Sequence, residues 1–165
     1  FPYALSDENT EAEFKVPVIN GKKMASRGTL VTEFRENGEE KSLTEKVQVM
    51  KLDDWASREK LSKLDFIKID VEGNEMKTLL GGKNTIQKFL PVLMVEMEQR
   101  HHKNPVWQEI SEVENWGFDA HFLNRNTFSL DKLTEEILLK NISDEKNKTE
   151  YINNIIFLPK NPKTS

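Results

Sequence analysis

The 165-residue chain contains no cysteine and no apolar run long enough to cross a membrane. The first absence excludes disulfide bonds, thiol nucleophiles and zinc sites built on cysteine. The second excludes a membrane-spanning helix, which needs about 20 consecutive apolar residues. A recognisable secretory signal is missing as well. Together these absences predict a cytoplasmic protein with no membrane partner.

The chain is also poor in glycine, with 7 residues, and neither GxGxxG nor GxGxG occurs in it. The backbone loop that cradles the phosphates of a dinucleotide is therefore not encoded. Acidic residues outnumber lysine and arginine by 28 to 24, which argues against the basic surface of a nucleic-acid-binding protein. His101 and His102 are adjacent rather than spaced as in HExxH, so we expect no metal site.

What is present is the composition of a charge-rich globular protein. Hydrophobic residues make up 36% of the chain and charged residues 32%. A chain of this length buries about 70% of the surface that its unfolded form exposes, which is enough for a core. We therefore predict a single domain over residues 1–165.

The strongest pattern runs from Leu64 to Glu98. An apolar, β-branched run at 66–71 is followed by two short helical patterns, and a second apolar run follows at 92–95. This order predicts an α/β fold in which the two runs are adjacent parallel strands at the centre of one sheet. Ligands of such sheets bind outside the carboxyl ends of the strands. The carboxylates at these ends are therefore the candidate functional residues, namely Asp70, Glu72, Glu96 and Glu98.

Charged side chains within the first run need partners if the strand is buried. We accordingly expect Lys68 to pair with a neighbouring carboxylate, and Asp70 itself could serve only to balance that charge. The alternative is that Asp70 acts directly on a ligand. Both readings of Asp70 stay open on the sequence.

Further segments are predicted from local patterns. Residues 12–19 and 46–52 are expected to be extended and could pair near a sheet edge, with a turn at Asn20-Gly21. Gly28 indicates a close approach of two backbones. Asp53 or Asp54 can cap a helix that runs to about Leu61. The nearly all-polar stretch 141–150 is predicted to be a mobile loop.

Several strings resemble the second half of FkbM-type methyltransferases. They are IKIDVEGNE at 67–75, LLGG at 79–82 and PVLMVEME at 91–98, supported by FPYALSD at 1–7, KLDDW at 51–55 and NNIIFLP at 153–159. These enzymes are class I, S-adenosylmethionine-dependent and built on a Rossmann-like sheet. The resemblance implies a mostly parallel sheet with an antiparallel last strand, here 154–158 paired with 118–123.

The resemblance also implies roles for individual residues. The loop at Leu5 and Ser6 would form a backbone wall beside the adenine of S-adenosylmethionine, although an ordinary exit from a strand explains it as well. Asp70 would lie nearest the methionine end of the cofactor and the methyl acceptor. Glu72 could orient the acceptor, and Glu96 would face the same crevice from the adjacent strand. The predicted catalytic residues are thus Asp70, Glu72 and Glu96, with Leu5, Ser6 and Asp70 binding the cofactor.

The family's glycine-rich loop after the first strand, and the acidic residue that ends the second, have no counterpart here. Each strand–helix unit takes about 30 residues, so roughly 60 upstream residues would be needed to supply them. We expect the chain to be the carboxyl-terminal portion of a methyltransferase domain, with a sheet incomplete on its N-terminal side. Taken alone, it should bind S-adenosylmethionine weakly.

The function that these features predict is S-adenosylmethionine-dependent O-methylation of a small molecule or carbohydrate. Transfer from a sulfonium depends mainly on alignment, and a carboxylate can accept the proton of the acceptor. One alternative is a non-catalytic α/β binding or interaction module. Another, less favoured, is a metal-dependent hydrolase that uses Asp70, Glu96 and His101. No motif indicates the acceptor or the oligomeric state.

Overall fold

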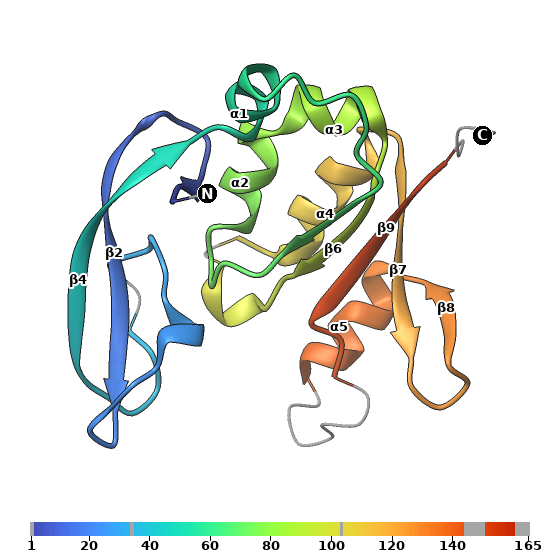
Figure 1. Cartoon of the computed structure of the whole chain (residues 1–165). Coiled ribbons are helices and arrows are strands. Elements are labelled where there is room, and N and C mark those ends of the chain that lie inside the picture. The colour runs from blue at the N-terminus through green and yellow to red at the C-terminus, as the bar shows by residue number, and fades with distance from the viewer. Residues whose placement is uncertain (1, 34, 103, 144–150, 161–165) are drawn as a thin grey trace. The chain divides into compact units, whose positions relative to one another are not determined.

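The fold is described from a computed structural model of the chain, which is drawn in Figure 1. None of its described helices has the length and apolar character needed to span a membrane. The prediction of a mobile loop at 141–150 is wrong for residues 141–143, which end a helix, and residues 144–150 lie outside the described residues. The residues described are 2–33, 35–102, 104–143 and 151–160.

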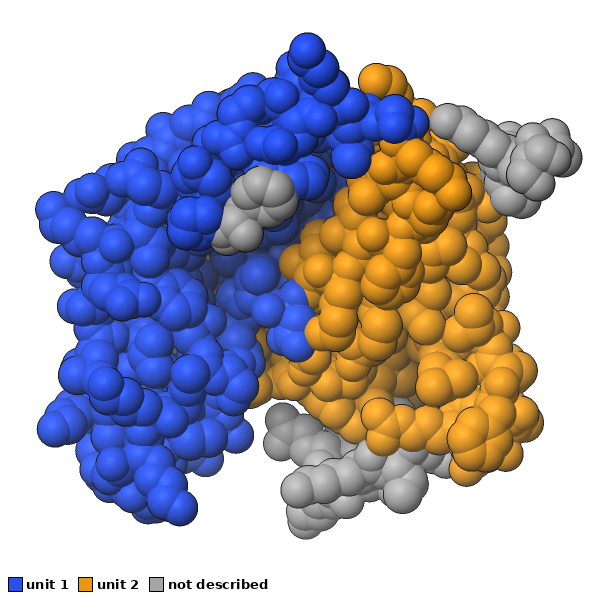
Figure 2. All heavy atoms as spheres, viewed as in Figure 1, with its two compact units in different colours: residues 1–62, 70–86 blue, residues 63–69, 87–165 orange. Residues whose placement is uncertain are grey.

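Two compact units make up the chain, coloured separately in Figure 2. Unit 1 contains Phe1–Ser62 and Asp70–Ile86, and unit 2 contains Lys63–Ile69 and Gln87–Ser165. The chain therefore passes between the units more than once. Compact units of this kind occur within one domain as well as in separate ones, so the single domain stays a prediction.

Unit 1 is built on a sheet with the strand order β1-β4-β2-β3. Its main feature is the long antiparallel pair of β2 (Thr10–Ile19) and β4 (Glu39–Met50), visible as the blue and teal arrows of Figure 1. β1 (Ala4–Leu5) runs parallel to β4, and β3 (Lys22–Lys23) pairs with the end of β2. The predicted pairing of 12–19 with the segment after 46 is confirmed.

The turn between β2 and β3 also follows from the sequence. Asn20 and Gly21 both have positive φ, +50° and +70°, as the two-residue turns that match the twist of a hairpin require. β4 begins at Glu39, well before the extended segment predicted from residue 46. Most of its side chains are exposed, so backbone pairing with β2, rather than apolar burial, holds its first half.

The helices of unit 1 are short. α1 (Leu52–Arg58) follows β4, α2 (Glu75–Gly81) follows the exit from β5, and α3 (Lys83–Phe89) begins in unit 1. A 3-10 turn, η1 (Ala25–Arg27), precedes Gly28.

Asp53 does not cap its own helix as predicted. The N-cap residue of α1 is Lys51, and no side chain caps it. Asp53 instead accepts hydrogen bonds from the N–H groups of Asn84 and Thr85, at 3.2 and 2.7 Å. The free N–H groups at the start of α3 thus have an acceptor from another helix, a tertiary contact that local sequence rules do not reveal.

Unit 2 is built on a sheet with the order β5-β6-β9-β7-β8. β5 (Phe66–Ile69) and β6 (Val92–Glu96) are parallel neighbours, as predicted. β9 (Asn154–Pro159) lies antiparallel between β6 and β7 (Phe118–Asn124), which confirms the expected pairing of the last strand. β8 (Ser129–Lys132) completes the sheet as a hairpin with β7.

Two parts of the fold prediction are wrong. The described sheets are mixed rather than mostly parallel. In unit 2, β9 pairs antiparallel with both β6 and β7, and β7 pairs antiparallel with β8. β5 lies at an edge of its sheet and not at the centre. Phe66 is 54% exposed, and Lys68 and Asp70 are exposed as well. The expected cost of burying charge in this strand therefore does not arise, since charged side chains are common on edge strands.

The core of unit 2 includes the buried residues of β6 and β9, which alternate along each strand and so share one face of the sheet. α4 (Val106–Glu114) packs on β7. α5 (Glu135–Ser143) contributes the buried Leu138, and η2 (Gln99–His101) leads into α4. Full burial of each such side chain contributes about 1.5–3 kcal/mol. The fully buried members are Leu93, Val95, Ile110, Val113, Phe118, Ala120, Ile155 and Phe157.

Candidate functional site

The chain leaves β5 through residues 70–74, which we name the strand-exit turn. Two of its residues have a left-handed backbone, with φ of +50° at Glu72 and +98° at Gly73. Glycine adopts such angles readily, but a residue with a Cβ atom rarely does. The turn is therefore held in this shape by contacts outside these two residues.

Glu75, the first residue of α2, supplies one set of these contacts. Its side chain is buried and accepts a hydrogen bond from the N–H of Val71 at 3.3 Å. Both of its carboxylate oxygens accept from the N–H of Gly73, at 3.0 and 3.1 Å. Hydrogen bonds to an ionised acceptor are among the stronger ones in proteins. Glu75 was not among the residues predicted from the sequence, although a carboxylate is favoured in the first turn of a helix by the helix dipole.

The predicted cofactor residues Leu5 and Ser6 lie against α2, the helix that follows this turn. The carbonyl of Leu5 accepts hydrogen bonds from Asn74 Nδ2 and Thr78 Oγ1, both at 3.1 Å. The hydroxyl of Ser6 is buried and donates to Asp7 at 3.1 Å. The end of β1 is thereby fixed to the start of α2.

Gly81 makes this close packing possible. A Cβ atom placed on Gly81 would lie 2.0 Å from the carbonyl oxygen of Ser6, far inside van der Waals contact. The first glycine of the LLGG string, Gly81, is thus required by the close packing of α2 against Ser6. The backbone at Ser6 is rigid, and its carbonyl faces the helix.

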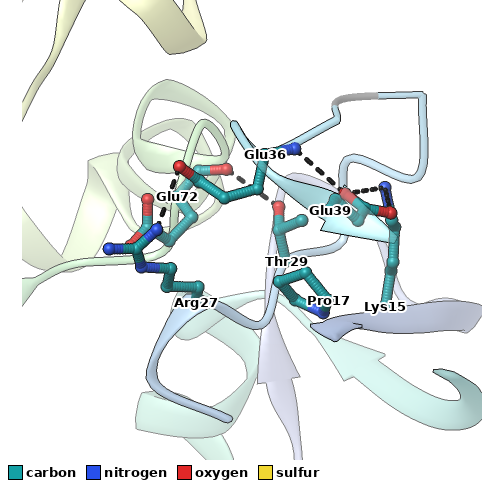
Figure 3. Close-up of a pocket in the computed structure, with 7 residues that line it drawn as sticks. All are labelled: Lys15, Pro17, Arg27, Thr29, Glu36, Glu39 and Glu72. Atoms are coloured by element: carbon teal, nitrogen blue, oxygen red, sulfur yellow. Dashed lines mark hydrogen bonds and ion pairs between the residues drawn. The ribbon is translucent and has the colours of Figure 1, made fainter. Parts of the chain in front are cut away.

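Asp70 and Glu72, the predicted catalytic residues of unit 1, occupy different surroundings. Asp70 is exposed at the start of the strand-exit turn, whereas Glu72 is half-buried within it. The backbone carbonyl of Glu72 accepts a hydrogen bond from the hydroxyl of Thr29 at 2.8 Å. Its side chain lines a small pocket, shown in Figure 3, with Lys15, Pro17, Arg27, Thr29, Glu36 and Glu39.

The polar walls of this pocket are joined by ion pairs. Lys15 and Glu39 lie 2.9 Å apart with side chains only 6% and 5% exposed, and Arg27 lies 3.2 Å from Glu36. Burial alone would raise the pKa of Glu39. The hydrogen bonds from the Lys15 side chain and the Glu36 N–H outweigh this, so the pKa of Glu39 is lowered. Glu39 is thus held as a carboxylate at neutral pH.

Glu96, the third predicted catalytic residue, belongs to unit 2. It ends β6, is half-buried, and accepts a hydrogen bond from Asn153 Nδ2 at 2.8 Å. Glu98, two residues on, forms an ion pair with Arg100. Within unit 2, Glu96 is therefore connected to the segment that leads into β9.

The loop after β6 is ordered by Gln99. Its side-chain oxygen accepts from the N–H of Val106 at 3.0 Å, and its nitrogen donates to the carbonyl of His102 at 3.2 Å. His102 Nδ1 lies 2.8 Å from a carboxylate oxygen of Glu109, with the imidazole 4% exposed. This histidine thus connects the loop with α4.

Metal binding was one alternative use of these carboxylates and histidines. Over the described ranges, no group of three or more His, Asp or Glu side chains is arranged to hold a metal ion. Of the residues in the hydrolase alternative, Asp70 belongs to unit 1, whereas Glu96 and His101 belong to unit 2.

The strand-exit turn can instead present a carboxylate on a rigid backbone. Asp70 is exposed, while the residues after it are fixed by Glu75 and by Thr29. A carboxylate in this position can attract a cation or accept a proton from a hydroxyl group.

Comparison with known proteins identifies the family. No curated protein and no solved structure matches the chain. The family model described as the methyltransferase FkbM domain matches residues 1–137. This match includes β1, the strand-exit turn, α2 and β6. The chain belongs to the FkbM methyltransferase domain family.

Proposed function

We propose that this domain carries out S-adenosylmethionine-dependent methylation of a hydroxyl group on a small molecule or carbohydrate. Membership of the FkbM methyltransferase family supports methyl transfer as the reaction. The structural observation that supports this site is the exposure of Asp70 on the strand-exit turn. The N–H groups of Val71 and Gly73, which follow Asp70, are fixed by Glu75. Alignment on a rigid backbone is what methyl transfer chiefly requires.

The residues of the strand-exit turn fit the proposed cofactor by charge. S-adenosylmethionine carries a positive sulfonium and a positive amino group, and when bound it supplies an electrophilic methyl group with a good leaving group. Asp70 offers a negative side chain outside the carboxyl end of a strand, where ligands of α/β sheets bind. We therefore assign Asp70 to the methionine end of the cofactor.

Leu5 and Ser6 fit in a more limited way. The carbonyl of Leu5 is already bonded to Asn74 and Thr78, and that of Ser6 faces Gly81. Neither carbonyl is therefore a natural acceptor for the adenine amino group. Their proposed contribution is a rigid backbone edge beside the ring.

For the chemical step, we assign Asp70 as the group that accepts the proton of the acceptor hydroxyl. Glu72, two residues after Asp70 in the strand-exit turn, would orient that hydroxyl. Glu96 stays a predicted catalytic residue on the strength of its place at the end of β6. General-base assistance of this kind contributes about 10²- to 10⁴-fold to a rate.

The function is tested with S-adenosylmethionine labelled on its methyl group. The natural gene product that contains this chain is incubated with a panel of monosaccharides and hydroxylated small molecules, and label is followed into product. Transfer that depends on a hydroxyl acceptor is the expected result. Binding of the cofactor without transfer to any acceptor would favour the binding module instead.

A further inference from the structure

We infer that Thr29 is a positioning residue for the strand-exit turn, and hence for Asp70. The inference rests on the function proposed above, because it concerns the geometry of the same site. Thr29 lies 43 residues before Glu72 in the sequence, and its buried hydroxyl donates to the Glu72 carbonyl at 2.8 Å. The bond is visible at the centre of Figure 3.

The bond fixes one particular peptide group. The carbonyl of Glu72 and the N–H of Gly73 belong to the same peptide plane. Thr29 binds the oxygen of this plane, and Glu75 binds its nitrogen at 3.0 and 3.1 Å. With both ends bonded, the plane cannot rotate freely about ψ of Glu72 and φ of Gly73, the two torsions beside it, and φ of Gly73 is +98°. Asp70 lies two residues before that plane.

The hydroxyl of Thr29 is itself held in direction. It accepts a hydrogen bond from the N–H of Val31 at 3.0 Å while it donates to Glu72. A hydroxyl has one proton to donate, so the bond to Val31 leaves that proton for the Glu72 carbonyl.

The backbone of Thr29 is anchored to the long antiparallel pair of β2 and β4. Thr29 and Lys15 exchange two backbone hydrogen bonds, each 2.9 Å long. Lys15 lies within β2, and its amino group forms the buried ion pair with Glu39 of β4. The antiparallel pair of β2 and β4 therefore supports the strand-exit turn through Thr29.

Gly28 permits this arrangement. A Cβ atom on Gly28 would lie 2.3 Å from the ring of Phe14, which would then have to move. The close backbone approach predicted for this segment occurs at the next residue, where Thr29 pairs with Lys15, and Gly28 itself has a negative φ of −71°. With Thr29 paired in this way, its hydroxyl reaches Glu72.

The test compares Thr29→Val, which removes the hydroxyl but keeps the shape, with Thr29→Ser, which keeps the hydroxyl. Thr32→Val, an exposed threonine nearby, is the matched control. Methyl transfer is measured with labelled S-adenosylmethionine, and hydrogen exchange is measured at the Gly73 amide. We expect Thr29→Val to lower kcat by about 10- to 100-fold and to speed exchange at Gly73. Thr29→Ser should restore both, and Thr32→Val should change neither.

Two outcomes would overturn the inference. If Gly73 exchanges at the wild-type rate in Thr29→Val, Thr29 does not hold the turn. If exchange is faster but kcat is unchanged, Thr29 stabilises the turn without positioning Asp70. If the unmodified protein transfers no methyl group to any acceptor, the proposed function is refuted. The role of Thr29 in positioning Asp70 for that reaction is then refuted as well. The exchange measurement then still decides whether Thr29 holds the turn.

Discussion

Glu75 binds the N–H of Gly73 with both oxygens of its carboxylate, 3.0 and 3.1 Å away, from a side chain that is 2% exposed. The relationship explains why a carboxylate follows the glycine turn. Gly73 has a φ of +98° and is half-buried. An N–H that loses its partner on burial costs up to about 1–3 kcal/mol, and the Glu75 carboxylate supplies that partner.

Glu75→Gln should therefore destabilise the protein although it preserves shape. The amide keeps one oxygen, but its NH₂ group replaces the second carboxylate oxygen that accepts from the N–H of Gly73. We expect a loss of about 1–3 kcal/mol in the free energy of unfolding, measured by urea denaturation. Glu112→Gln, an exposed glutamate on α4, is the control and should leave the unfolding midpoint unchanged. Equal midpoints for both variants would contradict the role given to Glu75.

The Lys15–Glu39 pair predicts a dependence of stability on pH. The pKa of Glu39 is lowered from an ordinary value of 4.5, because hydrogen bonds from Lys15 and Glu36 outweigh the effect of burial. A lowered carboxyl pKa means that the folded state binds its proton less tightly than the unfolded state. The stabilisation is therefore fully present above pH 4.5 and is lost as the pH falls through the lower folded value.

Glu39→Gln should remove this dependence. We expect the variant to be about 1–3 kcal/mol less stable at pH 7 and to lose less stability than the wild type on acidification. Urea unfolding at pH 7 and at several values below 4.5 measures both effects. Glu13→Gln is the control, because Glu13 is an exposed glutamate on β2, the strand that carries Lys15. Parallel pH profiles for the wild type and Glu39→Gln would show that the pair does not act as argued.

Gly81→Ala tests the contact between α2 and the end of β1. The new Cβ atom would lie 2.0 Å from the Ser6 carbonyl, which is backbone and cannot turn aside. Gly82→Ala is the matched control, because its Cβ would meet the Leu52 side chain, 2.7 Å away, which can change rotamer. We expect Gly81→Ala to cost about 1–3 kcal/mol and to cost more than Gly82→Ala. Thermal unfolding of the two variants decides this, and the reverse order would refute the contact.

The parts of the fold that the sequence predicted are those that depend on local pattern. The runs at 66–71 and 92–95 contain the parallel pair β5 and β6, because their β-branched and apolar residues favour strands and the helices between them supply the crossover. Asn20-Gly21 forms the turn that its backbone angles allow. The family resemblance supplied the pairing of the last strand, which no local pattern indicates.

The parts that the sequence did not predict depend on tertiary contacts. Asp53 serves α3 rather than α1, since the N–H groups that donate to it come from 31 and 32 residues further along the chain. The first half of β4 is polar and exposed, and only its pairing with β2 makes it a strand. For the site, the position of Asp70 after β5 was predicted, but the support from Glu75 and Thr29 was not. Both are single polar residues whose partners are backbone groups, and these leave no periodic signal.

Asp70 is the residue on which the proposed chemistry depends. It is exposed after an edge strand, so a purely electrostatic role toward Lys68 would be weak, since exposed pairs contribute about 0–1 kcal/mol. Asp70→Asn in the full-length protein should therefore keep the wild-type melting temperature. If Asp70 accepts the proton of the methyl acceptor, turnover should fall by about 10²-fold or more.

Asp65→Asn is the matched control, because Asp65 is an exposed carboxylate that pairs with Lys63 and has no assigned role. Turnover with labelled S-adenosylmethionine and the melting temperature are measured on both variants. A loss of turnover limited to Asp70→Asn, with both melting temperatures unchanged, is the expected result. A lowered melting temperature with normal turnover would make Asp70 a structural residue. That outcome would transfer the search for the general base to Glu72 and Glu96, the two other predicted catalytic residues.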